Sequence, residues 1–101
     1  MGLLAGCGDP HRSAEQQIAV GAAEYQVFVK QIAVVASSRV TGVELQTNRR
    51  PLWRVKFESQ DGSNVYCVYL DGPAHPANQT DLKLLAVWDC HGDLLYKAPD
   101  L

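Results

Sequence analysis

The densest group of potentially reactive side chains in the sequence is Asp89-Cys90-His91-Gly92-Asp93. A cysteine next to a histidine forms a nucleophile pair in some enzymes, and Asp89, His91 and Asp93 have the i, i+2, i+4 spacing of a metal-ligand set. In a strand, however, Cys90 and His91 would point to opposite faces and would not hydrogen-bond to each other. Asp and Gly also favour tight turns for backbone reasons. We therefore interpret this stretch as a hairpin turn, and predict no catalytic residue, metal site or cofactor.

Basic residues gather in a second short stretch, which contains Arg49, Arg50, Arg54 and Lys56. Guanidinium groups bind phosphates and carboxylates with a forked pair of hydrogen bonds. One hypothesis is therefore an anion-binding site formed by the three arginines, close to Trp53. The alternative is a solvated strand face beside a turn, and both interpretations stay open.

Length and charge exclude several classes of protein. A chain of 101 residues is long enough for one domain with its own core, and not for two. Its formal net charge of -2 argues against a general nucleic-acid binder, which usually carries a basic excess. No apolar run approaches the roughly 20 residues that span a membrane. The three cysteines are too few for a disulfide scaffold and match no zinc pattern.

The N-terminus carries the most specific motif. Leu4-Ala5-Gly6-Cys7 resembles the lipobox of bacterial lipoproteins, where a signal peptidase cuts before a cysteine that is then lipidated. The resemblance implies a lipid on Cys7 and a membrane tether in the cell envelope. Such a signal also needs a basic segment and an apolar segment of about 7–15 residues, which the residues before Leu4 do not supply. The hypothesis is therefore a truncated lipoprotein signal, and the alternative is a chance match in a flexible tail over residues 1–12.

Hydrophobic periodicity predicts a long helix after this tail. Ser13-Ala14-Glu15-Gln16 matches the capping box that begins helices, and a helical apolar period then runs over residues 14–36. Several β-branched residues leave a second possibility open, namely a helix that ends near residue 24 and is followed by a strand. The expected buried stripe of the long helix consists of Ile18, Ala22, Tyr25, Phe28 or Val29, Ile32 and Val35.

After residue 38 the apolar period changes to two, which is typical of strands. Alternation predicts strands over residues 40–47, 53–58, 64–70, 82–90 and 94–97. Asp61-Gly62 is a strong signal for a tight hairpin. This turn pairs residue 58 with 65, 57 with 66 and 55 with 68.

The element order predicts a single α+β domain over residues 13–101, with one long N-terminal helix packed on a four- to five-stranded antiparallel sheet. This order resembles the cystatin-like architecture, in which a sheet wraps one long helix. The Q-x-V-x-G hairpin of the cystatin inhibitors would fall at residues 46–50, where this chain reads Q-T-N-R-R. The resemblance therefore implies a fold and not protease inhibition.

Alternation also assigns each strand residue to one face of the sheet. The face expected beneath the helix holds Trp53, Val55, Phe57, Tyr66, Val68, Leu70, Leu82, Leu84, Ala86, Trp88 and Cys90. Cys67 falls on the other face, so we predict that it forms no disulfide with Cys90. That outer face also carries a stripe of apolar residues, namely Val65, Cys67, Tyr69, Leu85 and Val87. Such a stripe indicates a second layer or the interface of a homodimer or homo-oligomer.

Two hypotheses for the function follow. The first is a non-catalytic binding or interaction module of bacterial origin, tethered in the envelope if Cys7 is lipidated. The alternative is a small cytosolic α+β protein, of an orphan or mobile-gene type, that binds a small apolar ligand between helix and sheet. Tyr25, Trp53, Tyr66 and Trp88 would line that pocket, although aromatic residues in such positions usually fill the core.

Overall fold

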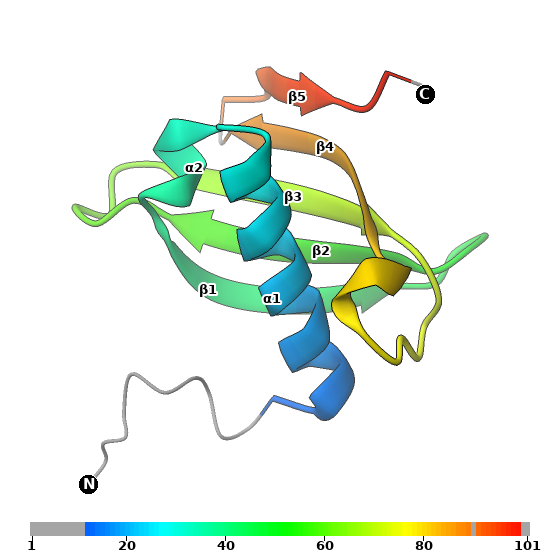
Figure 1. Cartoon of the computed structure of the whole chain (residues 1–101). Helices are drawn as coiled ribbons and strands as arrows, with labels where there is room; N and C mark the ends of the chain where they lie inside the picture. The colour runs from blue at the N-terminus through cyan, green and yellow to red at the C-terminus, as the bar shows by residue number, and fades with distance from the viewer. Residues whose placement is uncertain (1–11, 90, 100–101) are drawn as a thin grey trace, which may run out of the picture.

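The computed structural model describes residues 12–89 and 91–99, and it shows a helix layer on one face of a sheet (Figure 1). The helices are α1 (Ala14–Val29), the short α2 (Ala33–Ala36) and the 3-10 turn η1 (Gln79–Asp81). The strands are β1 (Arg39–Gln46), β2 (Leu52–Glu58), β3 (Val65–Asp71), β4 (Lys83–Asp89) and β5 (Leu94–Lys97). They form one antiparallel sheet in chain order, which confirms the α+β class and is compatible with a cystatin-like topology. None of the described helices is long and apolar enough to cross a membrane.

The start of α1 is the capping box that the sequence predicts. The Ser13 hydroxyl accepts a hydrogen bond from the Gln16 backbone N–H at 3.1 Å, and the Gln16 side chain accepts one from the Ser13 N–H at 2.9 Å. These two bonds satisfy backbone donors that a helix otherwise leaves without a partner.

The helix ends earlier than predicted. α1 stops at Val29, and Gln31 adopts the left-handed conformation with φ 59°. The Gln31 N–H then bonds to the Phe28 carbonyl at 3.0 Å, and the Ile32 N–H bonds to the Val27 carbonyl at 3.1 Å. This is a Schellman motif, which usually has glycine at the left-handed position. Both predictions, a helix over 14–36 and a helix ending near 24, were therefore wrong, because glutamine at this position gives no stop signal.

Small side chains bring α1 close to the sheet. The residues of α1 that are buried are Ala19, Val20, Ala22, Ala23 and Val27. Tyr25, Phe28 and the alternative Val29, which we expected in the buried stripe, are 63%, 71% and 49% exposed instead. The predicted stripe was wrong at these positions because the buried face of α1 is centred on Ala19, Ala23 and Val27, and residues 25, 28 and 29 lie to the side of it or opposite it.

One polar side chain of α1 reaches the edge of the sheet. Gln26 donates a hydrogen bond from Nε2 to the Leu82 carbonyl and accepts one at Oε1 from the Leu84 N–H, each at 2.7 Å. β5 pairs with β4 only at residues 86–88, so it does not cover this part of the edge. The Gln26 amide thus provides the donor and the acceptor that a neighbouring strand would provide.

The central hairpin confirms the predicted register. Glu58 pairs with Val65, Phe57 with Tyr66 and Val55 with Val68.

At the tip of this hairpin, Gly62 has φ 76°, and the Asp61 carboxylate accepts hydrogen bonds from Ser59 and Ser63. These bonds, chiefly those from Ser63, lower the pKa of Asp61 from 3.8 to about 2.

A bulge in β4 overturns part of the face assignment. Leu70 pairs with Leu84 and Tyr69 with Ala86, so Leu85 is an extra residue without a partner of its own. Beyond it the alternation is reversed, with Val87 fully buried and Trp88 39% exposed. The predictions that Ala86 and Trp88 face the core and that Val87 faces outward were therefore wrong.

The Schellman motif leads to a stability prediction. Gln31→Gly should stabilise the fold by about 0.5–1 kcal/mol, because glycine removes the left-handed strain but adds chain entropy to the unfolded state. The control is Lys30→Gly, since Lys30 has the ordinary helical φ of -80°. It should lose about 0.5–1 kcal/mol in urea unfolding. Equal losses in both variants would contradict this account of the helix end.

The Gln26 contact leads to a second prediction, for which Gln26→Glu is the nearly isosteric test. At pH 7 the carboxylate would face the Leu82 carbonyl without a proton to donate, so we expect a loss of about 2–4 kcal/mol in unfolding free energy. Burial and this carbonyl raise the pKa of the new carboxyl above its unfolded value. The folded state therefore binds more protons, and the loss should shrink as the pH falls toward about 4.

The matched control is Gln16→Glu in the same helix, where glutamate also suits a capping box. This variant should stay within about 0.5 kcal/mol of the original protein. A Gln26→Glu variant that loses no stability, or whose loss does not depend on pH, would show that the edge contact does not stabilise the fold.

Candidate functional site

The sheet face turned away from α1, here called the outer face, carries an apolar strip along its middle. Register pairs Cys67 with Trp88 and Tyr69 with Ala86 on this face. Val65 continues the strip along β3, since it alternates in phase with Cys67 and Tyr69. The apolar strip is therefore formed by Val65, Cys67, Tyr69, Ala86 and Trp88. The described helices contact the opposite face, where the core lies (Figure 1).

Ion pairs flank the apolar strip on β1 and β2. Arg39 pairs with Glu58 at 3.0 Å, and the Arg54 guanidinium pairs with Glu44. Burial by itself would lower the pKa of Arg54. The Tyr69 hydroxyl and the Glu44 carboxylate favour the charged guanidinium more strongly, so the pKa of Arg54 is raised. These pairs lie at the surface, so they contribute little to stability. They compensate Arg39 and Arg54, whereas Lys56, exposed on β2 beside Cys67, forms no ion pair within the described residues.

The three arginines of the predicted anion site do not come together. Arg49 and Arg50 line one hollow of about 340 Å³, whose other lining residues are Gln46, Asn48, Leu52 and Leu85. We call this set of six residues the basic hollow. Arg54 instead lines a separate hollow with Glu44 and Lys56. Of the three predicted arginines, Arg49 and Arg50 thus line the same hollow. Arg54 does not, and it pairs with the Glu44 carboxylate instead.

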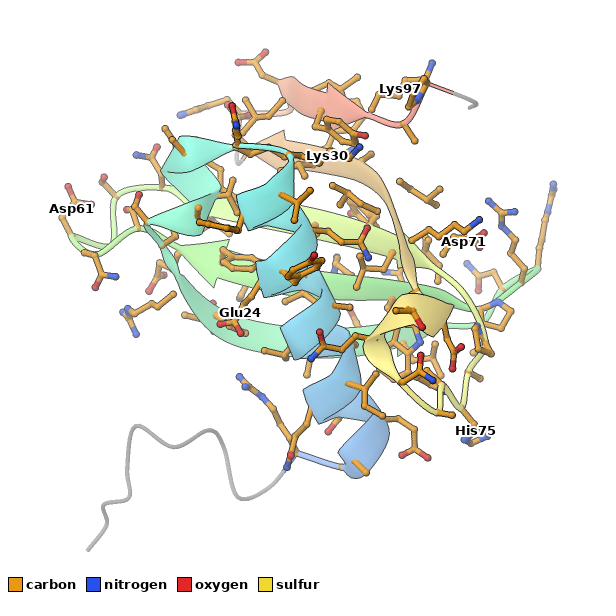
Figure 2. The ribbon with its side chains drawn as sticks, viewed as in Figure 1. Glu24, Lys30, Asp61, Asp71, His75 and Lys97 are labelled. Carbon is orange, nitrogen blue, oxygen red and sulfur yellow. The ribbon has the colours of Figure 1, made fainter. Side chains whose placement is uncertain are left out.

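The basic hollow lies at one end of the outer face. It is built where β1 ends and β2 begins, and register places the start of β2 beside Asp71 at the end of β3. Trp88 pairs with Cys67, nearer the opposite end, where the Asp61 hairpin lies. Figure 2 shows Asp61 and Asp71 at opposite ends of the sheet. The basic hollow and the Trp88 end of the apolar strip are therefore separated along the strands.

The four aromatic residues expected to line a pocket do not share one. Trp53 and Tyr66 are 2% and 8% exposed in the core, and Trp53 Nε1 donates to the Pro73 carbonyl at 3.0 Å. Trp88 lies on the outer face. Tyr25 lines a hollow of about 500 Å³ beside η1, whose lining includes none of the other three. Their placement gives no support to a ligand held between helix and sheet by these four side chains.

Asp89 and residues 91–93 belong to a turn, as the sequence indicates. The Asp89 carboxylate accepts hydrogen bonds from the His91 N–H at 2.9 Å and the Asp93 N–H at 2.8 Å. Gly92 completes the turn with φ 83°. Within residues 12–89 and 91–99, no cluster of three or more His, Cys, Asp or Glu side chains could hold a metal ion.

Two of the cysteine predictions fall on residues outside the described part of the chain. Cys7, the expected lipidation site, and Cys90 both lie there. Cys67 is half-buried on the outer face and has a free thiol. Its position opposite Lys56 confirms the face that alternation assigned to it.

Sequence reasoning missed four of the six residues of the basic hollow. Gln46 and Leu52 pair with each other across β1 and β2, so alternation could have placed them on the face of Arg54. Asn48 belongs to the turn between these strands. Leu85 is the bulge residue of β4, and no signal in the sequence marks a bulge there.

No family model, curated protein or solved structure matches this chain.

Proposed function

We propose that this protein is a non-catalytic interaction module that acts as a homodimer, with the outer face as the interface. The observation that carries the proposal is the apolar strip in the middle of this face. Trp88, one of its members, is 39% exposed, although tryptophan is among the side chains that gain most from leaving water. A face of this kind is more stable when a second surface covers it.

The distribution of polar groups supports this interface. Protein interfaces typically have an apolar core, enriched in aromatic residues, inside a polar rim. On the outer face, Tyr69 lies on the central strand β3 and Trp88 on its neighbour β4, while the Arg39–Glu58 and Glu44–Arg54 pairs lie on β1 and β2. Because Arg39 and Arg54 are each compensated within one copy, the repulsion that a second copy of the same chain meets on β1 and β2 comes chiefly from Lys56.

The size of the face supports a weak rather than a permanent dimer. Strands of about 7 residues and five-strand width give a face of roughly 500 Å² at the usual spacings. Two copies would then bury about 1,000 Å² in total, which is at the lower limit for a specific interface. We therefore expect a dissociation constant in the micromolar range.

Sedimentation equilibrium of two charge-introducing variants tests this interface. Trp88→Glu places a carboxylate in the apolar strip and, in a two-fold dimer, brings a second carboxylate toward it, so association should weaken at least tenfold. Phe28→Glu is the matched control, because Phe28 is also apolar and is 71% exposed on the helix side. It should leave the dissociation constant unchanged.

Two results would overturn this proposal. One is an unmodified protein that stays monomeric up to about 1 mM, well above the concentration at which micromolar affinity gives dimers. The other is association that Phe28→Glu disrupts and Trp88→Glu does not, which would move the interface to the helix side. Circular dichroism shows whether each variant is folded, and alkylation of Cys67 should slow on dimerisation in the unmodified protein.

We also propose that the module is tethered to a membrane of the cell envelope through a lipid on Cys7. The lipobox-like Leu4-Ala5-Gly6-Cys7 stretch supports this location. When the native gene is expressed with its upstream codons, labelled palmitate should enter the protein, and Cys7→Ser should abolish the label. Equal labelling of both forms, or no label in either, would contradict the tether and would leave the dimer proposal unaffected.

A further inference from the structure

We propose that the basic hollow binds a monocarboxylate with a short apolar body, with the carboxylate on Arg49 and the apolar body on Leu52 and Leu85. This inference does not rest on the homodimer, because all six residues of the basic hollow belong to one chain, but a partner that covered this end of the outer face would compete with the ligand. Three features of the hollow carry it, namely its net charge, its free hydrogen-bond donors and its apolar side chains.

The charge of the basic hollow matches a single negative charge. Arg50 Nε lies 3.6 Å from the Asp71 carboxylate, so the charge of Arg50 is largely compensated. Arg49 forms no ion pair within the described residues. One uncompensated guanidinium favours a monoanion over a phosphate dianion, for which paired arginines are better suited.

Two side-chain amides around the hollow have no hydrogen-bond partner among residues 12–89 and 91–99. Gln46 and Asn48 each have a side-chain amide, and neither amide forms a hydrogen bond to any part of the chain that the structure describes. An arginine and two amides can together donate several hydrogen bonds to the two oxygens of a carboxylate. The free donors therefore fit an acceptor-only group.

The apolar side chains and the volume fit a short hydrocarbon body. Leu52 and Leu85 come from different strands, β2 and β4, and are both half-buried. A hollow of about 340 Å³ lies at the lower end of the range for small-molecule sites. It can hold the carboxylate and about five or six carbons, which is the size of hexanoate or of a C-terminal leucine residue.

The same chemistry occurs in a free carboxylic acid and at the C-terminus of a peptide. Titration with hexanoate, followed by 1H–15N NMR, tests the free acid. Titration with acetyl-Ala-Ala-Leu, as free acid and as C-terminal amide, tests the peptide. In both arms, amide resonances of residues 46–52 and of Leu85 should shift, while those around Arg54 should not. The peptide amide and hexanol should each cause much smaller shifts, because they lack the charge.

The matched variants are Arg49→Gln and Arg54→Gln, both on polar parts of the outer face. Arg49→Gln should weaken hexanoate binding at least fivefold, and Arg54→Gln should leave it unchanged, because Glu44 already engages Arg54. Whichever of hexanoate and the peptide acid binds more tightly identifies the source of the ligand.

Three results would overturn the inference. These are no shift at 50 mM hexanoate or peptide acid, equal shifts with acetate, or tighter binding of inorganic phosphate than of hexanoate. Sedimentation of Arg49→Gln separates this inference from the homodimer, since we expect this variant to bind hexanoate at least fivefold more weakly and still to dimerise.

Discussion

The close contact between α1 and the sheet is the constraint on which the rest of the structure depends. Alanines at 19, 22 and 23 let the helix backbone approach the strands, so the core beneath it is filled mainly by strand residues such as Trp53 and Phe57. At this short distance the Gln26 amide reaches the β4 backbone and forms its two hydrogen bonds at 2.7 Å. The helix therefore covers one face of the sheet and also closes part of its edge.

This arrangement determines which surfaces remain for binding. Tyr25 and Phe28 lie off the buried face of α1 and extend into solvent, and the short helix layer does not reach around to the outer face. A five-stranded sheet with one covered face leaves the other to be hydrated or occupied by a partner. Apolar residues along the middle of that face favour a partner, whereas the ion pairs of β1 and β2 remain stable in water.

The sequence was most informative where backbone geometry repeats regularly. Two-residue alternation and the Asp61-Gly62 turn predicted the register of β2 with β3, and the capping box predicted the start of α1. Prediction failed where a single residue interrupts the repeat. Glutamine occupies the left-handed position that ends α1, and Leu85 forms a bulge without a glycine to mark it. Arg49 and Arg50 could be identified as candidates from their residue type alone. Leu85 could not be assigned to the same hollow, because the bulge that places it there has no signal in the sequence.

The bulge connects the two proposed binding surfaces. With unbroken alternation, Trp88 would lie beneath the helix and Val87 would take its place outside, so the apolar strip would lose its largest side chain. The bulge residue itself, Leu85, lies in the basic hollow with Leu52 and the two arginines. The extra residue in β4 thus turns Trp88 toward the outer face, and the extra residue itself, Leu85, lines the basic hollow nearer the other end of that face. Bulges often re-aim side chains next to functional sites, and both surfaces here depend on this one.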